Sequence, residues 1–192
     1  LVMSNQSFAI DANNLQYEVV YYLQSHECDD PRDTRGIAVD MAEQNLYLGY
    51  NNLSCGGEGP VRKVGIASQN VDASVPHRGK CITVDDANRI YVGYTGSILV
   101  YTADLLPLYV IPIPGTCEGL TVKREAGVLA LYATNKSASL IYRWELVENG
   151  TLISSHTAAG LDGDGEMALP SSAVRGIAVA ADGRILVAHP AG

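Results

Sequence analysis

Positive charge is scarce in this chain. Only 13 of its 192 residues are lysine or arginine, against 21 aspartate and glutamate residues, so the formal net charge is −8. Nucleic acids and anionic membrane surfaces are bound through clusters of cationic side chains. The composition therefore argues against nucleic acid as a partner.

Long hydrophobic runs are missing as well. No window approaches the 18 uninterrupted apolar residues typical of a membrane-spanning helix, so we expect no membrane span. The chain begins at Leu1, with neither a start methionine nor a charged leader. We therefore expect a mature or processed form of the protein.

Patterns typical of catalysis are also absent. The sequence has four scattered histidines, no G-x-S-x-G segment and no glycine-rich phosphate loop. It has no histidines or cysteines at metal-ligand spacing either. We expect no enzyme activity, no cofactor and no metal site.

Cysteine is present in an even number, without a C-x-x-C pair. Such spacing favours two disulfides over a zinc site. Disulfides persist in oxidising compartments, so this feature predicts an extracellular protein. The four cysteines are Cys28, Cys55, Cys81 and Cys117.

Four N-x-S/T triplets point to the same compartment. Each falls where the sequence suggests a loop or a strand end, which is where a glycan is tolerated. The acceptors are Asn5, Asn52, Asn135 and Asn149. The sequence therefore predicts a secreted glycoprotein.

One short phrase recurs along the chain. RGIAVD at 35–40 returns as RGIAVA at 175–180, with weaker copies at 80–85 and 118–123. Each copy alternates small and apolar residues, which predicts a short buried strand. Glycines in the copies, namely Gly36, Gly119 and Gly176, are expected to let neighbouring inner strands approach closely.

Further strands follow each copy of the phrase. We predict second strands at 45–50, 89–94, 128–133 and 184–189, third strands at 61–67, 97–102 and 139–146, and fourth strands at 108–113 and 151–157. No stretch has a convincing helical period. The chain is therefore predicted to be all-β and built of four-stranded antiparallel units, which is the repeat scale of propeller blades.

The repeats resemble NHL-repeat blades. The resemblance rests on segment 35–40 followed by 45–48, and on 82–85 followed by 89–93. It implies a β-propeller and does not imply a chemistry, because the matching residues are structural. The third unit departs from the pattern by carrying Lys123 where aspartate is expected.

The expected organisation is a single β-propeller domain over residues 1–192. Its blades cover about 31–75, 76–114 and 115–160, and a composite fourth blade joins 171–192 to 1–27. Closing a ring through a composite blade leaves no unpaired sheet edge. Two alternatives remain open: the chain is part of a propeller of five or six blades, or the half-blades complete each other between molecules.

Four charged residues stand immediately before the inner strands and are expected to ring one mouth of the central channel. They are Arg35, Lys80, Glu118 and Arg175. One interpretation is a site for an anion or an acidic ligand, and the other is a solvated rim joined by salt bridges. A metal-dependent propeller of the gluconolactonase or amidating-lyase kind would need carboxylates here.

Propeller topology also predicts the cysteine pairing, because all four cysteines are expected on one face. The pairs most easily formed are Cys28 with Cys55 and Cys81 with Cys117. The main competing pair is Cys55 with Cys81.

The function predicted from sequence is that of a secreted, glycosylated and non-catalytic binding or structural module. Its partners would be proteins, glycans or copies of itself in a head-to-tail assembly. The alternative function is that of a propeller hydrolase or lyase with a divalent metal in its channel.

Overall fold

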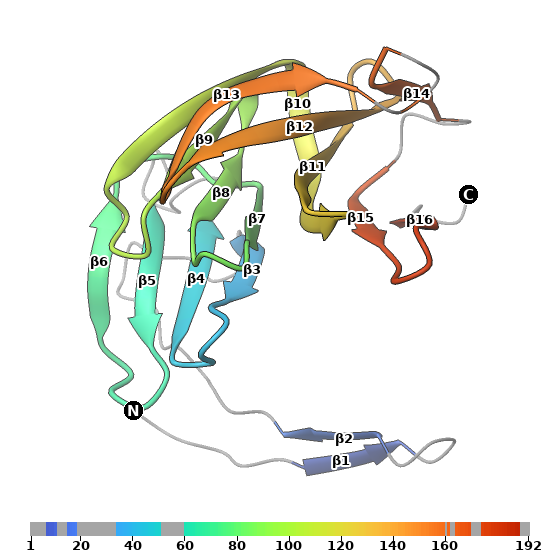
Figure 1. Cartoon of the computed structure of the whole chain (residues 1–192). Helices are drawn as coiled ribbons and strands as arrows, with labels where there is room; N and C mark the ends of the chain where they lie inside the picture. Colours follow the sequence, from blue (N-terminus) through green and yellow to red (C-terminus); the bar gives the residue numbers. More distant parts are fainter. Residues whose placement is uncertain are drawn as a thin grey trace.

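The structure is a computed structural model that describes residues 7–10, 15–18, 34–50, 60–159, 161, 164–169 and 174–188 (Figure 1). Within these ranges the structure contains strands and no helix, and neighbouring strands pair antiparallel. None of these residues forms an apolar helix long enough to cross a membrane. The prediction of an all-β chain is confirmed.

The first four-stranded unit is a separate sheet, which we call blade 1. Its strands are β3 (Thr34–Val39), β4 (Asn45–Tyr50), β5 (Val61–Gly65) and β6 (Val71–Val75), in that order across the sheet. The first three strands were predicted from the repeats. No strand was expected at β6, because its sequence has little apolar alternation.

Blade 2 continues into blade 3 through one long strand. Blade 2 consists of β7 (Cys81–Val84), β8 (Ile90–Gly93), β9 (Thr95–Tyr101) and the first part of β10 (Pro107–Glu125). The pairing of β10 with β9 shifts register between Pro112 and Thr116, beside Gly115, whose φ is +82°. Two strands that the sequence suggested separately, at 108–113 and 118–123, are therefore one strand.

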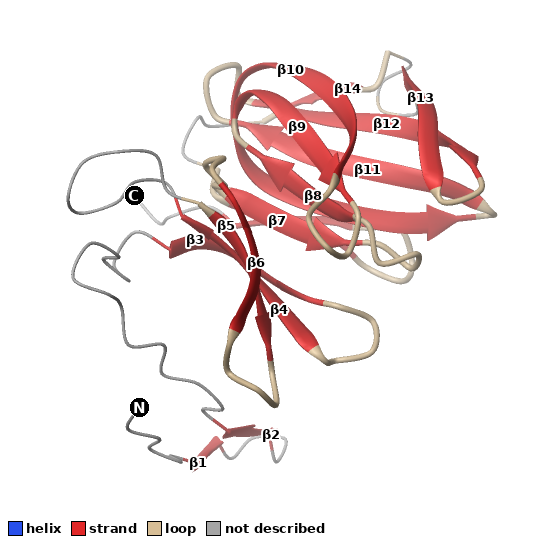
Figure 2. Ribbon diagram, turned by 90° about the vertical axis from the view of Figure 1, so that its left-hand side faces the viewer, coloured by secondary structure: helices blue, strands red, loops and turns tan. Residues whose placement is uncertain are grey.

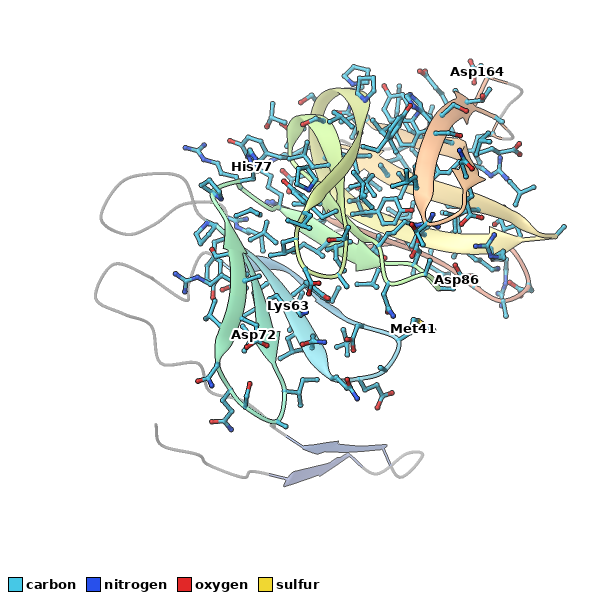
Figure 3. The ribbon with its side chains drawn as sticks, turned by 60° about the vertical axis from the view of Figure 1, so that its left-hand side comes forward. Met41, Lys63, Asp72, His77, Asp86 and Asp164 are labelled. Carbon is cyan, nitrogen blue, oxygen red and sulfur yellow. The ribbon has the colours of Figure 1, made fainter. Side chains whose placement is uncertain are left out.

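Blade 3 begins with the second part of β10 and continues through β11 (Val128–Asn135) and β12 (Leu140–Asn149). Two strands share its outer edge, because β13 (Leu152–Ala158) pairs with residues 144–149 of β12 and β14 (Glu166–Ala168) pairs with residues 140–142. The larger sheet fans out beside the blade 1 sheet in Figure 2.

The two ends of the chain form separate hairpins. β1 (Ser7–Ile10) pairs with β2 (Leu15–Glu18), and β15 (Gly176–Val179) pairs with β16 (Ile185–Ala188). The strand pairings do not join these hairpins into the predicted composite blade, and the sheets form an open arc (Figure 1). Closure into a four-bladed ring is therefore not observed.

The hydrophobic core lies between successive blades. Ile82 of β7 belongs to the same buried cluster as Tyr47 of blade 1, and Leu120 of β10 to the same cluster as Tyr91 of blade 2. Ile177 of β15 packs on the cluster around Ala130 of blade 3. An apolar residue of β7, β10 and β15 thus packs against the preceding blade, which explains why the phrase recurs.

The aspartate that ends the repeated phrase shapes the turn after the inner strand. Asp85 Oδ1 accepts hydrogen bonds from the backbone N–H groups of Ala87 and Arg89, each at 2.9 Å. Asp40 Oδ1 accepts from Gln44 N at 2.7 Å and Asn45 N at 3.2 Å. Burial opposes ionisation of Asp40, but these bonds and one from the Asn45 side chain outweigh it and lower the pKa.

A glycine of the repeated phrase is needed where inner strands approach each other. A Cβ on Gly119 would lie 2.9 Å from Gly176 Cα and 2.9 Å from Thr134 Oγ1, whereas one on Gly176 would meet only Ala188 Cβ at 3.6 Å. We expect Gly119→Ala to destabilise the fold by about 1–3 kcal/mol through overpacking, with Gly176→Ala nearly neutral. Urea unfolding of both variants tests this expectation, and equal midpoints would contradict it.

Candidate functional site at the channel mouth

The structure brings three of the four predicted rim residues together. Lys80 Nζ lies 3.2 Å from Glu118 Oε1, and Arg175 Nη1 lies 3.4 Å from Glu118 Oε2. The Glu118 side chain is only 10% exposed, whereas that of Arg175 is 52% exposed. The fourth residue, Arg35, is exposed at the equivalent position of β3. We call these four residues the rim cluster.

The rim cluster carries three cations and one carboxylate. Glu118 uses one oxygen for each of two cations, so its charge is already neutralised within the cluster. Lys80 and Arg175 thus share one carboxylate, and this local excess of positive charge contrasts with the net charge of −8 of the whole chain. Guanidinium groups at an exposed rim suit a carboxylate, sulfate or phosphate group.

A divalent metal does not fit the rim cluster. Calcium takes six to eight oxygen ligands, and the cluster supplies one carboxylate that is already paired with cations. Across the part of the chain that the structure describes, no group of three or more His, Cys, Asp or Glu side chains is placed to hold a metal ion.

Two of the predicted disulfide cysteines lie directly beside the rim cluster. Cys81 Sγ and Cys117 Sγ are 3.3 Å apart, and both side chains are buried. A Cβ on Gly93 would lie 2.5 Å and 2.6 Å from these sulfurs, so the glycine makes room for the pair. Burial, followed by the hydrogen bond with Cys117, raises the pKa of the Cys81 thiol well above its usual value. Cys28 and Cys55 lie outside the described residues.

Two of the four predicted glycan acceptors can be placed. Asn149 is exposed as the last residue of β12, beside the turn to β13. Asn135 is fully buried, its Nδ2 donates to Pro114 O, and its Oδ1 accepts from Ser137 N at 2.9 Å. Asn5 and Asn52 lie outside the described residues.

The contrast between Asn149 and Asn135 leads to a prediction about glycan occupancy. The Asn135 side chain is fully buried and its amide is held by Pro114 and Ser137, so attaching a glycan to Nδ2 would require the residue to leave the interior. After expression through a secretory pathway, we expect a glycan at Asn149 and none at Asn135. Glycopeptide mapping with Asn149→Gln as the control measures both sites. A glycan at Asn135 would contradict the buried placement.

Sequence reasoning missed a buried ion network between blades 2 and 3. The Arg89 side chain is 2% exposed, and its Nε lies 2.6 Å from Asp85 Oδ2. Its Nη2 lies 2.5 Å from Glu148 Oε1 of blade 3. Tyr91 Oη donates to Asp85 Oδ2 at 2.8 Å. The only signal in the sequence was an arginine at the start of a predicted strand.

A cleft of about 630 Å³ opens between blade 3 and the β15–β16 hairpin, and it was also missed. Arg143 dominates its wall, donating to Tyr132 Oη, Glu125 Oε2 and Glu145 Oε1, each at 3.0 Å. Burial opposes the charged form of Arg143, but these bonds outweigh it and raise its pKa. Because Arg143 is neutralised by residues of its own blade, the cleft offers no surplus charge for a ligand.

The third repeat has a lysine where the repeat pattern expects an aspartate, and this lysine lies beside the cleft. Lys123 stands in the aspartate position, and its Nζ donates to Ala180 O at 2.6 Å and Ala181 O at 3.4 Å. The lysine therefore attaches the turn of β15–β16 to blade 3.

The chain resembles propeller-like chains among solved structures. A protein from Lactobacillus plantarum matches with a TM-score of 0.61 and 13% identity, over 96% of this chain and 55% of its own. Kuenenia stuttgartiensis hydrazine synthase matches with a TM-score of 0.57 and 14% identity, over 87% of this chain and 45% of its own. This chain therefore spans about half the length of both structures, 45% and 55%.

No family model and no curated protein sequence matches this chain. The structural likeness shows a propeller-like fold and nothing of the activity, because the identities are 13% and 14%. Membership of the NHL-repeat family stays a prediction from the sequence repeats.

Proposed function

We propose that this chain is a secreted, glycosylated propeller module of NHL-like repeats that binds protein or glycan partners and catalyses no reaction. Four blade equivalents make up the chain, with β1–β2 supplying outer strands and β15–β16 supplying inner strands of a composite blade. The proposal joins the propeller-like fold to the cysteine and glycan-acceptor patterns of the sequence.

One observation carries the binding role: Lys80 and Arg175 share the single carboxylate of Glu118. Arg175 keeps half of its side chain in solvent while it contacts Glu118 at 3.4 Å. An incoming acidic group can therefore pair with Arg175 without first breaking the partly buried pair of Lys80 and Glu118. The partner class that fits this rim is an acidic peptide or an acidic glycan.

Binding of a hexaglutamate peptide at low ionic strength tests the proposal. We expect the Arg35→Ala/Arg175→Ala variant to bind several-fold to about tenfold more weakly than the unchanged protein, since each lost charge contact is worth about 1 kcal/mol or less when exposed. Glu118→Gln should bind more tightly, because it removes the internal competitor for Arg175.

Arg184→Ala is the matched control for this experiment, because Arg184 is 77% exposed and lies outside the rim cluster. Hexalysine serves as the control ligand. Equal affinity of the double variant and the unchanged protein would remove the rim cluster as the binding site. Stoichiometric calcium or zinc in the purified protein would instead favour the hydrolase or lyase alternative.

A further inference from the structure

Residues at the same repeat position can be compared from blade to blade. The first comparison concerns the face of each blade that packs against the preceding blade. Ile82 in blade 2 and Leu120 in blade 3 occupy the same repeat position, and each is 7% exposed. Ile37 occupies that position in blade 1 and is 64% exposed. Val39 and Met41 on the same end of the arc are 42% and 64% exposed. The face that buries apolar residues in two blades is uncovered in the first.

The opposite end of the arc has a matching uncovered face. Tyr47, Tyr91 and Ala130 hold one equivalent position in the second strands of the three blades, and each is 0% exposed. Leu186 holds that position in β16 and is 55% exposed. Each interior residue of this set is covered by the following blade, and nothing in the described structure follows β16 in the arc.

The arginines that begin two of the second strands show the same contrast between a buried and an exposed side chain. Arg89, at the start of the second strand of blade 2, has a side chain that is 2% exposed because it reaches Glu148 of blade 3. Arg184 is its equivalent in the β15–β16 hairpin, is 77% exposed and pairs with Asp182 within the same turn. The hairpin therefore presents the residues of an interior blade face without the blade that covers them.

We propose that a second copy of this chain covers both faces: the β3 face of each copy packs against the β15–β16 hairpin of the other, so that two open arcs close one ring. Within the arc, Ile82 packs in the same cluster as Tyr47, and Leu120 in the same cluster as Tyr91. Ile37 of one copy would then meet Leu186 of the other by the same rule. This inference rests on the propeller architecture of the proposed function and not on its binding role.

Three observations favour a second copy over closure within one chain. The inner strands contact each other in the order β3, β7, β10 and β15, and the arc remains open between β3 and β15. Ile37 at one end of the arc and Leu186 at the other hold repeat positions that are buried in the interior blades, so each end offers the apolar surface that the other end needs.

The β1–β2 hairpin supplies the third observation. It lies apart from β15–β16 in Figure 1 and precedes blade 1 in the sequence. In the two-copy ring, the hairpin of one chain would sit beside β15–β16 of the other, where the outer strands of the composite blade are needed. The exchange would pair the outer edge of β16, which has no partner strand among the described residues.

Sedimentation equilibrium of enzymatically deglycosylated protein tests the proposal. We expect twice the 20.4 kDa mass of one chain, and we expect Ile37→Lys and Leu186→Glu, each alone, to sediment as single chains. An equimolar mixture of the two variants should regain the double mass. In that mixture one interface pairs the new lysine with the new glutamate, and the other keeps Ile37 against Leu186.

Val110→Glu is the control, because Val110 is 54% exposed on β10, away from both ends of the arc. It should leave the double mass unchanged. A single-chain mass for the unchanged protein would overturn the proposal, whether the ring closes within one chain or needs blades outside this sequence. A mass that grows without limit with concentration would overturn the closed pair.

Hexaglutamate binding by the unchanged protein, measured beside its mass, separates this inference from the proposed function. If the unchanged protein is a single chain that still binds the peptide through the rim cluster, the inference fails and the proposed function stands. If it is a two-copy ring in which the rim cluster binds nothing, the binding role fails and the assembly stands.

Discussion

The Asp85→Asn variant is expected to lose about 3–5 kcal/mol of folding free energy, since it removes one partner of a fully buried ion pair. The side chains of Asp85 and Arg89 are 1% and 2% exposed. Asparagine keeps the size of the side chain but presents an amide in place of the oxygen that accepts from Arg89 Nε and Tyr91 Oη. Arg89 would remain buried with Glu148 as its one acidic partner.

Asp86→Asn is a well-matched control, because Asp86 is the next residue and also binds an arginine. Its partner is Arg124, at 2.6 Å, and the two side chains are 46% and 35% exposed. An exposed pair contributes little to stability. Chemical denaturation at neutral pH measures both variants. Similar unfolding midpoints for the two would show that the buried network between blades 2 and 3 does not stabilise the fold.

For protein expressed through a secretory pathway, reduction is expected to lower the stability by about 4 kcal/mol, the chain-entropy value for a loop the length of 81–117. The reason is the 3.3 Å separation of Cys81 Sγ and Cys117 Sγ. When they form a bond, the two thiols lose two protons and two electrons to a small disulfide such as oxidised glutathione, which leaves as two thiols. The bond would join the inner strands of blades 2 and 3.

Non-reducing tryptic mapping decides the pairing. Cys81 falls in peptide 81–89, Cys117 in 90–123, Cys28 in 1–32 and Cys55 in 36–62, so each cysteine is in a different peptide. We expect 81–89 linked to 90–123. A Cys28→Ser/Cys55→Ser variant should keep this link and its sensitivity to reductant. Free thiols at both Cys81 and Cys117, or a link from 36–62 to 81–89, would contradict the prediction.

Strands were the most predictable part of the structure, because the inner and second strands of each repeat contain alternating small and β-branched residues. β6 was missed because Val71–Val75 contains aspartate and serine and is largely exposed. The continuity of β10 was missed because Pro112, Pro114 and Gly115 read as breaks in the sequence, whereas the structure accommodates them in a bend at a register shift.

The candidate site was predictable only in part, and for a topological reason. Lys80, Glu118 and Arg175 could be grouped because they hold one position in successive repeats. Arg89 and Glu148 hold different repeat positions and lie 59 residues apart, so no spacing rule connects them. The exposure of Ile37 depends on what lies next to blade 1, which local sequence does not encode.

The unbroken course of β10 has a mechanical consequence. Because this one strand is the outer edge of blade 2 and the inner strand of blade 3, the two blades share a backbone and hydrogen-bond ladders on both sides of the bend. The two blades are therefore continuous in their backbone hydrogen bonding. Among the described residues, no strand pairing joins blade 1 to them. Blade 1 is held by the segment 76–80, by side-chain packing and by hydrogen bonds such as those from Met41 N to Asn88 Oδ1 and from Tyr47 Oη to Ala103 O. We therefore expect any bending of the arc to fall at the boundary between blades 1 and 2.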